Sequence, residues 1–370
     1  MSRLLPETFR SRANYALALA SEALRPALWA MGRLLAGSPL PRKEWKRGVL
    51  IGADHIGDIL YRTAALPTLA AATPGCAWSW FAGPPSHEII EADPVVNGRC
   101  VLLPDGVEET RFSQLVTKLR EGKYDVAVCY DTGRYWKFLL AAACAGIPTR
   151  VGYTHKGFSG LVTYPIQIHW PQAFSAYFRD LVSQLAEVSV ARDLRPRLSS
   201  SMESRAVATR FWEEKGLSEK KRVLACAFFT RQKNAGERFA DFAEVARRVQ
   251  ARTGISLCFL ASASEREELE FQMRKESLSG IIAAGELGLL AAGALLQGCS
   301  ALLATDSGVR HLGNAAGIPV VFLRNLGSHR IETGAYSDTE IDATRTDGTG
   351  LDIENAERVL CEIMEAGKVS

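Results

Sequence analysis

The feature that most constrains this chain is a regular alternation of short apolar runs and helical patterns, which begins at Gly48. The first four apolar runs are "GVLIGA", "AWSWFAG", "RCVLLP" and "YDVAVCY", and helical patterns fall near 58–72, 111–121 and 135–145. Runs that are apolar along their whole length are typical of strands buried on both faces. Their alternation with helices predicts the α/β class, as a doubly wound parallel sheet covered by helices on both sides.

The same alternation starts again after a polar stretch at 191–205, with the runs "RVLACAFF", "ISLCFLAS", "GIIAAG", "ALLATD" and "PVVFLR". We predict two Rossmann-like domains, residues 48–190 and 206–370, joined by a linker at 191–205. Ligands of open α/β sheets bind at the carboxyl ends of the strands, and two such domains in tandem would bring two sets of strand ends to one cleft. Functional residues are therefore expected in the turns that follow strands.

Residues 1–47 form a basic extension before the first domain. They hold nine Lys and Arg against three Glu, a net charge of +6, although the whole chain carries only +3. The pattern over 8–36 predicts one or two helices. Two interpretations stay open. The segment could be a basic amphipathic helix on an anionic membrane surface, with Trp29 and Trp45 near the interface, or a helix packed on the protein itself with its arginines in solvent.

Composition excludes several classes of protein. The net charge of +3 is too small to indicate a nucleic-acid partner. No segment reaches the roughly 18 apolar residues that a transmembrane helix needs, and no convincing signal peptide is present. The eight cysteines are scattered, without a C-x-x-C pair, which is typical of reduced thiols. A cytoplasmic protein is expected, with peripheral attachment to the inner face of the membrane as the alternative that the basic extension leaves open.

The segment from Ala301 to Arg330 carries the strongest local signal. A predicted strand ends at Thr305, the turn Asp306-Ser307-Gly308 follows, and a helix opens with His311 in its first turn. Backbone N–H groups and the positive end of a helix dipole bind anions, and glycine lets the ligand come close to the backbone. A phosphate-bearing ligand fits this pattern. A simple helix cap made by the Asp or Ser side chain fits it as well.

These residues resemble a family motif. The pattern D-[ST]-G-x-x-H, a helix of small residues and then G-x-P is similar to that of the ADP-heptose:lipopolysaccharide heptosyltransferase family, glycosyltransferase family 9. Its residues here are Asp306, Ser307, Gly308, His311, Gly317 and Pro319. The turn after the first strand resembles the same family's N-terminal signature through Gly57, Asp58 and Pro67. The resemblance extends over about 48–365 and leaves the basic extension outside it.

The resemblance implies a GT-B fold of two Rossmann-like domains, in which the N-terminal domain holds the acceptor and the C-terminal domain the nucleotide-sugar. It implies inverting transfer of a heptose or a related sugar, with ADP-heptose as the expected donor, to a lipopolysaccharide-type or other glycan acceptor. Inversion needs a base that removes the proton of the acceptor hydroxyl, and the resemblance gives this role to Asp58. Asp54, His55 and Gly57 are then expected to contact the acceptor, although a surface turn would explain the two ionisable residues equally well.

The leaving nucleoside diphosphate needs cationic and hydroxyl donors. The loop "FFTRQKNAGERF" supplies Thr230, Arg231, Lys233 and Arg238, and together with 306–311 it is expected to bind the phosphates. It departs from the family pattern, because Glu237 stands where a lysine is frequent. Ser262 follows the next strand and is expected at the ribose, with a helix cap as the alternative.

No metal and no cofactor beyond the sugar nucleotide are expected, because the chain lacks an Asp-x-Asp after a strand and any His/Cys cluster with ligand spacing. Two other functions stay open: a sugar-nucleotide epimerase of the same fold, and a catalytically silent sugar-nucleotide-binding protein. A silent relative would have no chemical reason to keep both Asp58 and the 306–311 motif, which favours the transferase.

Overall fold

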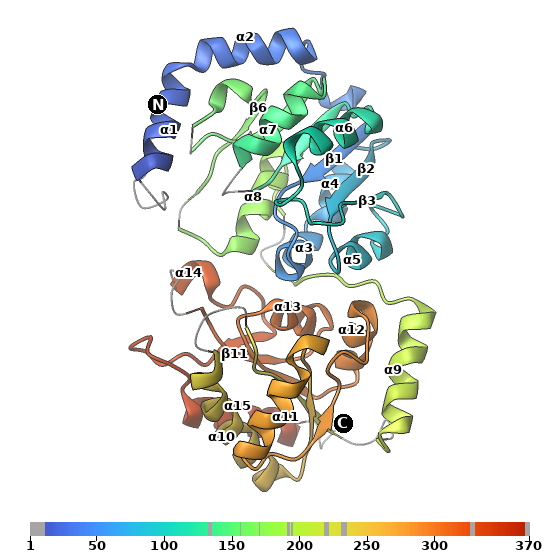
Figure 1. The fold of residues 1–370 in the computed structure, drawn as a ribbon, viewed down its shortest axis with the longest axis vertical. Coiled ribbons are helices and arrows are strands. Elements are labelled where there is room, and N and C mark those ends of the chain that lie inside the picture. The colour runs from blue at the N-terminus through green and yellow to red at the C-terminus, as the bar shows by residue number, and fades with distance from the viewer. Residues whose placement is uncertain are drawn as a thin grey trace. The chain divides into compact units, whose positions relative to one another are not determined.

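The structure is a computed structural model that describes residues 12–131, 135–155, 157–169, 171–190, 193, 195–217, 222–230, 235–325 and 330–366. The chain forms two compact units, shown in Figure 1. Unit 1 comprises Met1–Asp54, Ala65–Trp170 and Tyr177–Ala191, and unit 2 comprises His55–Ala64, Pro171–Ala176 and Arg192–Ser370. Each unit is built on its own sheet.

Unit 1 contains a six-stranded sheet in the order β3-β2-β1-β4-β5-β6, and all its neighbouring strands run parallel. The strands are β1 (Arg47–Ile51), β2 (Ala77–Ala82), β3 (Cys100–Leu102), β4 (Val126–Cys129), β5 (Thr149–Tyr153) and β6 (Tyr164–Ile166). β1 lies between β2 and β4, and its apolar side chains are fully buried. The turn after β1 therefore leaves the sheet from near its middle.

The helices of unit 1 are α1 (Arg12–Ala23), α2 (Arg25–Ala36), α4 (Leu66–Ala72), α5 (His87–Ala92), α6 (Phe112–Gly122), α7 (Tyr135–Cys144) and most of α8 (Phe174–Ala186), with short 3-10 turns η2 (Arg42–Glu44) and η3 (Ser159–Leu161). Val49 and Ile51 of β1, Ala127 of β4 and Phe138 of α7 share one buried apolar cluster with Leu115 of α6. This packing follows the period of the sequence, because every fourth residue or so of α6 is apolar.

Unit 2 repeats the topology. Its strands are β7 (Val223–Ala227), β8 (Ser256–Phe259), β9 (Ile281–Ile282), β10 (Ala301–Thr305), β11 (Val320–Leu323) and β12 (Glu340–Asp342). All pairs are parallel and the order is β12-β11-β10-β7-β8-β9, so both units wind outward from their first strand in the same way. The sequence-based prediction of two doubly wound α/β sheets is confirmed.

The helices of unit 2 are α3 (Ile56–Thr63), α9 (Met202–Glu214), α10 (Ala235–Thr253), α11 (Arg266–Lys275), α12 (Leu289–Gln297), α13 (Gly308–Ala315), α14 (Arg330–Thr333) and α15 (Ile353–Ala366), with the 3-10 turn η4 (Ala263–Glu265). Phe242, Leu257, Leu303 and Leu360 belong to its buried core. The core brings together α10, β8, β10 and α15.

The units differ from the predicted domains at three places. α9 begins at Met202, inside the predicted linker 191–205, where the Ser201 side chain accepts a hydrogen bond from the Ser204 N–H and caps the helix. α3 follows β1 directly but belongs to unit 2, where Thr63 exchanges two hydrogen bonds with the backbone of Arg197. Pro171–Ala176 belongs to unit 2 as well, so the chain enters unit 2 twice before completing unit 1. β5, β6 and β12 were not predicted, because each is short or interrupted by polar residues or proline.

The N-terminal helices pack on unit 1. Ser21 accepts a hydrogen bond from Phe158 N–H, and both carboxylate oxygens of Glu22 bond Ser159. A Cβ added at Gly32 would lie 2.8 Å from a guanidinium nitrogen of buried Arg150, so α2 approaches the domain closely there. The two predicted helices are confirmed, and their inner side makes the packing contacts of the second interpretation.

Within the described part of the chain, no helix is both long and apolar enough to cross a membrane. All eight cysteines are free. Burial raises the pKa of Cys76 and Cys100 to about 12, so these thiols are poor nucleophiles.

Candidate functional site

The two segments that the sequence analysis emphasised, the turn after β1 and the turn after β10, meet in unit 2. α3 packs on α13, and two glycines allow the close approach. A Cβ at Gly57 would lie 2.5 Å from Cδ2 of His311, and one at Gly308 would lie 3.0 Å from Cβ of Ile56. A larger residue at position 57 would force α3 away from α13. Gly57 is therefore needed for packing, and its contact with an acceptor stays a prediction.

Asp58 lies in the first turn of α3. Its Oδ1 accepts a hydrogen bond of 2.6 Å from the Tyr61 hydroxyl and lies 3.3 Å from Nη1 of Arg62. Its side chain is 25% exposed, and Oδ2 has no partner among the described residues. One oxygen is therefore held in place while the other is free to accept a proton.

Tyr61 links Asp58 to the second motif. Its ring meets His311 edge to face, with the ring centroids 5.9 Å apart. The guanidinium carbon of Arg62 lies 4.7 Å from the centroid of the same ring, which is a cation–π contact. Tyr61 is thus fixed by three neighbours, and it fixes the carboxylate of Asp58 in turn.

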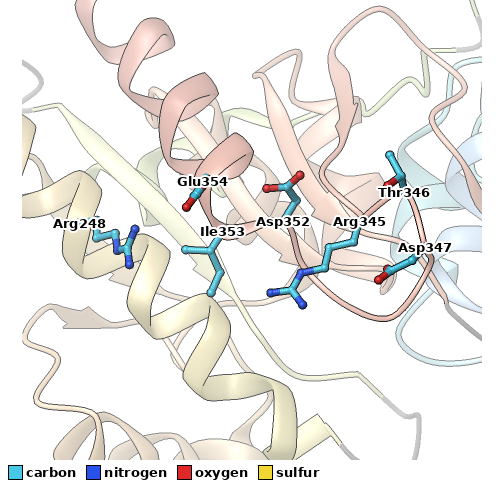
Figure 2. A pocket seen from close by; sticks show the side chains of 7 residues that line it. All are labelled: Arg248, Arg345, Thr346, Asp347, Asp352, Ile353 and Glu354. Atoms are coloured by element: carbon cyan, nitrogen blue, oxygen red, sulfur yellow. The ribbon is translucent and has the colours of Figure 1, made fainter.

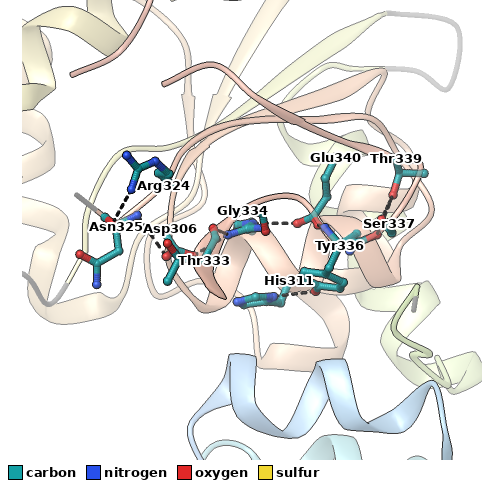
Figure 3. A network of polar contacts seen from close by, with 12 residues as sticks. Asp306, His311, Arg324, Asn325, Thr333, Gly334, Tyr336, Ser337, Thr339 and Glu340 are labelled. Carbon is teal, nitrogen blue, oxygen red and sulfur yellow. Dashed lines mark hydrogen bonds and ion pairs between the residues drawn. The ribbon is translucent and has the colours of Figure 1, made fainter. Parts of the chain in front are cut away.

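His311 is held from its other side by Tyr336. Its Nδ1 lies 2.7 Å from the Tyr336 hydroxyl, and the two rings are stacked, as Figure 3 shows. Burial, with a contribution from Arg310, lowers the pKa of His311 well below its ordinary value. Burial, with Glu340, raises the pKa of Tyr336 well above its ordinary value. Both groups are therefore neutral near pH 7, and the pair is a fixed polar contact rather than a charged one.

Arg310 organises the backbone around this pair. It donates to Glu340 at 2.7 Å, to Asp306 at 2.8 Å, and to the carbonyls of Thr333 and Gly334. Its side chain is 1% exposed, and its Cζ lies 3.5 Å from the ring centroid of Phe322. The residue preceding His311 thereby ties the start of α13 to the loop between α14 and β12.

Asp306 belongs to the same network of hydrogen bonds. Its Oδ1 accepts from Arg310, and its Oδ2 accepts from the backbone N–H of Asn325 at 3.3 Å. The carboxylate therefore joins the carboxyl ends of β10 and β11 (Figure 3). Its predicted contact with the nucleotide stays a prediction, and its observed contacts fix the shape of the turn.

Ser307 occupies the N-cap position of α13, yet its side chain makes no cap hydrogen bond. Its Oγ is buried and has no partner among the described residues. A buried hydroxyl without a partner is costly, and so are helix N–H groups that no side chain caps. Ser307 therefore does not cap the helix in this structure. Its hydroxyl and the uncapped N–H groups at the start of α13 are donors of the kind that bind an anion.

A small pocket adjoins this turn in unit 2. It is lined by Thr230, Arg238, Thr305, Asp306, Leu323, Arg324 and Asn325, which come from the loop after β7, the start of α10 and the carboxyl ends of β10 and β11 with the turns that follow them. Of the predicted donor residues, Thr230 lines it together with Asp306. Arg238 forms no ion pair or hydrogen bond with any residue that the structure describes, so its charge is available to a ligand.

The remaining predicted donor residues are placed differently. Arg231 and Lys233 lie outside the described residues. Ser262 forms a capping box with Glu265: its N–H and its hydroxyl both bond Glu265 Oε2, at 2.8 and 2.7 Å. These are the contacts of the helix-cap alternative, and a contact with ribose remains a prediction.

Of the predicted acceptor residues, His55 is exposed at the start of α3 and makes no cap hydrogen bond. Asp54 belongs to unit 1 and is buried. Its Oδ2 accepts from the backbone N–H groups of Gly83, at 2.6 Å, and Val107, at 3.1 Å. Asp54 therefore joins the loops that follow β2 and β3, a structural use of the carboxylate that the sequence did not indicate.

A second pocket of unit 2 is lined by Arg248, Arg345, Thr346, Asp347, Asp352, Ile353 and Glu354 (Figure 2). Its charged groups are largely used in the fold. Asp352 accepts from the N–H of Asn355 at the start of α15, and Arg248 pairs with Glu357. Neither family motif reaches it, so the pocket beside the 306–308 turn is the better candidate.

Among the described residues, no three His, Cys, Asp or Glu side chains are grouped so that they could hold a metal ion.

Comparison with known proteins agrees with this geometry. The model of glycosyltransferase family 9 (heptosyltransferase) matches residues 112–347, which is more than half of the chain. The chain belongs to glycosyltransferase family 9. It is therefore a glycosyltransferase with a site for a sugar nucleotide. No curated protein matches the chain.

Solved structures of this family share the fold. A family 9 glycosyl transferase from Veillonella parvula is 20% identical, with a TM-score of 0.71 over 83% of this chain and 88% of that one. ADP-heptose lps heptosyltransferase II of E. coli is 21% identical, with a TM-score of 0.66 over 87% and 98%. An E. coli heptosyltransferase solved with ADP-2-deoxy-2-fluoro heptose is 13% identical, with a TM-score of 0.61 over 85% and 99%. The predicted GT-B fold is confirmed.

Sequence reasoning missed the residues that hold this family 9 site together. Arg310 stands at an unspecified position of the motif, and Tyr336 and Glu340 follow in a stretch without a clear period. Arg324 and Asn325 could have been found, because they follow directly on the apolar run of β11 and so had to lie at the carboxyl edge of the sheet.

Proposed function

We propose that this glycosyltransferase moves a heptose, with inversion, from ADP-heptose to a lipid-linked glycan of the lipopolysaccharide type. The observation that carries the proposal is the pair of unsatisfied groups at the 306–308 turn. Among the described residues, Ser307 Oγ is buried without a partner, and Arg238 in the adjoining pocket forms no ion pair. A diphosphate would satisfy both, since charged oxygens accept from hydroxyl, guanidinium and helix N–H donors alike.

Asp58 is the proposed general base. As the acceptor oxygen attacks the anomeric carbon, its proton passes to Oδ2 of Asp58, the oxygen without a partner. The bond between the anomeric carbon and the β-phosphate oxygen breaks, and its electron pair leaves with ADP. Attack from the face opposite the leaving group inverts the anomeric configuration.

The leaving group is proposed to be stabilised without a resident metal. Arg238, Ser307 Oγ and the N–H groups at the start of α13 would meet the charge that grows on the β-phosphate. Asp306 and Arg310 would hold this turn in shape rather than touch the phosphate. The acceptor is proposed to be presented by a membrane.

Calorimetry with ADP tests the donor site. Arg238→Gln should weaken ADP binding roughly tenfold or more, and Ser307→Ala about three- to tenfold, because each removes a donor to a charged group. Arg345→Gln is the matched control, since it removes an arginine from the other pocket of unit 2. Equal loss in all three variants would mean a general charge effect, and undiminished binding by the first two would refute the proposed donor site.

The donor and the stereochemistry need separate tests. ADP should bind more tightly than GDP, UDP or CDP, and transfer from ADP-heptose should persist in the presence of a chelator. NMR of the product should show the anomeric configuration opposite to that of the donor. Retention of configuration would exclude Asp58 as a simple general base, and release of a free epimerised sugar without an acceptor would replace the transferase by an epimerase.

A further inference from the structure

The outward side of the two N-terminal helices is apolar. The described residues include fifteen exposed large apolar side chains, and six of them lie on α1 and α2 or between them: Leu17, Leu19, Leu24, Trp29, Leu34 and Leu35. Leu34 is 87% exposed and Trp29 is 55% exposed. We call these six side chains the α1–α2 face. Soluble proteins rarely expose apolar side chains so densely unless something covers them.

This face belongs to helices that are already fixed. The opposite side of α1 and α2 is packed on unit 1 through Ala18, Ser21 and Gly32, which are buried. Figure 1 shows both helices along the outside of unit 1, and α2 packs beside α7 and the turn η3. The six apolar side chains are therefore not the side of these helices that packs on unit 1.

The charges beside the face are basic. Arg25 is exposed, and Arg33 lies with its Cζ 5.5 Å from the centroid of the Trp29 ring. The one acid within α1 and α2 is Glu22, and both its carboxylate oxygens bond Ser159 of unit 1. The described surface of these helices therefore combines apolar side chains with arginine and offers no free carboxylate.

We propose that the α1–α2 face docks on an anionic lipid surface. The leucines and Trp29 would enter the boundary between headgroups and acyl chains, where tryptophan is favoured because its ring is apolar and its N–H is polar. Arg25 and Arg33 would reach the anionic headgroups with their charged ends. Since the helices are held in place by unit 1, docking requires no folding step.

Charge decides between lipid and a second copy of the chain. A two-fold contact would set Arg25 and Arg33 against the same residues of the partner, with no free acid from either helix to neutralise them. An anionic lipid surface neutralises them directly. The inference rests on the proposed function only for its choice of a membrane as the surface where the acceptor resides.

The test uses the full chain and vesicles of phosphatidylcholine with or without phosphatidylglycerol. Trp29→Ser combined with Leu34→Ser should weaken binding to the phosphatidylglycerol vesicles at least about tenfold, because two large apolar side chains no longer enter the interface. The matched control is Met202→Ser combined with Phe271→Ser, which removes two exposed apolar side chains of unit 2, 90% and 54% exposed. The control should bind like the wild type.

Fluorescence supplies a second readout. Trp emission should shift to shorter wavelength on phosphatidylglycerol vesicles, and Trp29→Phe should bind but lose most of that shift. Added salt should weaken binding, since headgroup attraction is screened.

Three results would overturn the inference: no binding to anionic vesicles, equal binding by the double variant, or a concentration-dependent dimer in sedimentation that the double variant abolishes. Titration with ADP separates these from failure of the proposed function. A protein that binds ADP but not vesicles loses this inference alone, and one that binds vesicles but no nucleotide loses the proposed function alone.

Discussion

Asp54 and Asp58 stand four residues apart in the turn after β1, and the structure uses them in opposite ways. Asp54 turns into unit 1, is buried, and accepts from two backbone N–H groups through one oxygen. Asp58 belongs to unit 2, is partly exposed, and is held by side chains through one oxygen only. The resemblance assigned the base role to Asp58 and acceptor contact to Asp54, but the sequence did not show how either carboxylate is held.

The difference teaches what to look for in a candidate base. Both hydrogen bonds of Asp54 join loops of unit 1 and its carboxylate is buried, so it is not open to a substrate hydroxyl as Asp58 is. Asp58 is partly exposed, and its Oδ2 has no partner among the described residues, so it can take a proton while Tyr61 keeps it in position. Partial exposure of Asp58 and the unsatisfied buried hydroxyl of Ser307 mark the residues proposed to act on substrate.

The largest effect is expected from Asp58→Asn. The amide keeps the size of the side chain and an oxygen for Tyr61, but it cannot take a proton, so kcat should fall about 10²- to 10⁴-fold. Steady-state transfer measures kcat, while ADP affinity and the free energy of unfolding should stay near those of the wild type. Near-normal kcat in this variant would remove the distinction between the two carboxylates.

Asp54→Ala should act on stability instead. It leaves the N–H groups of Gly83 and Val107 without their acceptor, at about 1–3 kcal/mol of unfolding free energy for each. Denaturant unfolding measures the loss, and the folded protein should keep its kcat. Asp54→Asn is the control, because an amide oxygen can still accept both bonds. A large fall in kcat with unchanged stability would instead place Asp54 at the acceptor.

The sequence predicted the sheets well because buried parallel strands are apolar throughout, and this signal is local. It located the 306–308 turn for the same reason, as the end of one such strand. It could not show that α3 leaves unit 1, because that follows from the fit of Gly57 against His311, far apart in the chain. Nor could it assign Ser262 or Asp54, since a cap and a ligand contact use the same short polar side chains.

Tyr61→Phe tests how much the hydrogen bond from Tyr61 contributes to the action of Asp58. The variant keeps the ring against His311 but removes the hydroxyl that bonds Oδ1 at 2.6 Å. A hydrogen bond to a charged group is worth about 1.5–2 kcal/mol, so kcat should fall roughly ten- to thirtyfold. KM and ADP affinity should hardly change, because Tyr61 positions the base rather than the substrates. An equal change in kcat and KM would assign Tyr61 to substrate binding.

The smallest effect is the pH dependence of stability that His311 causes. His311 contacts Tyr61, which holds Asp58 in place. Burial, with Arg310, lowers its pKa well below the ordinary value, so the native protein does not take up this proton where the unfolded chain does. As pH falls through the unfolded pKa of about 6.5, the unfolded state gains a proton and native stability decreases. The loss attributable to His311 should be about 1 kcal/mol between pH 7.5 and 6.

His311→Gln retains a polar partner for Tyr336 but cannot titrate. Its unfolding free energy should therefore differ from that of the wild type by a constant above about pH 7.5 and by a shrinking amount below it. Denaturant unfolding of both proteins across this range measures the difference. A constant difference at every pH would mean that His311 has the same pKa in the native protein as in the unfolded chain, so that its contact with Tyr61 and Tyr336 would become charged beside Asp58 as the pH falls.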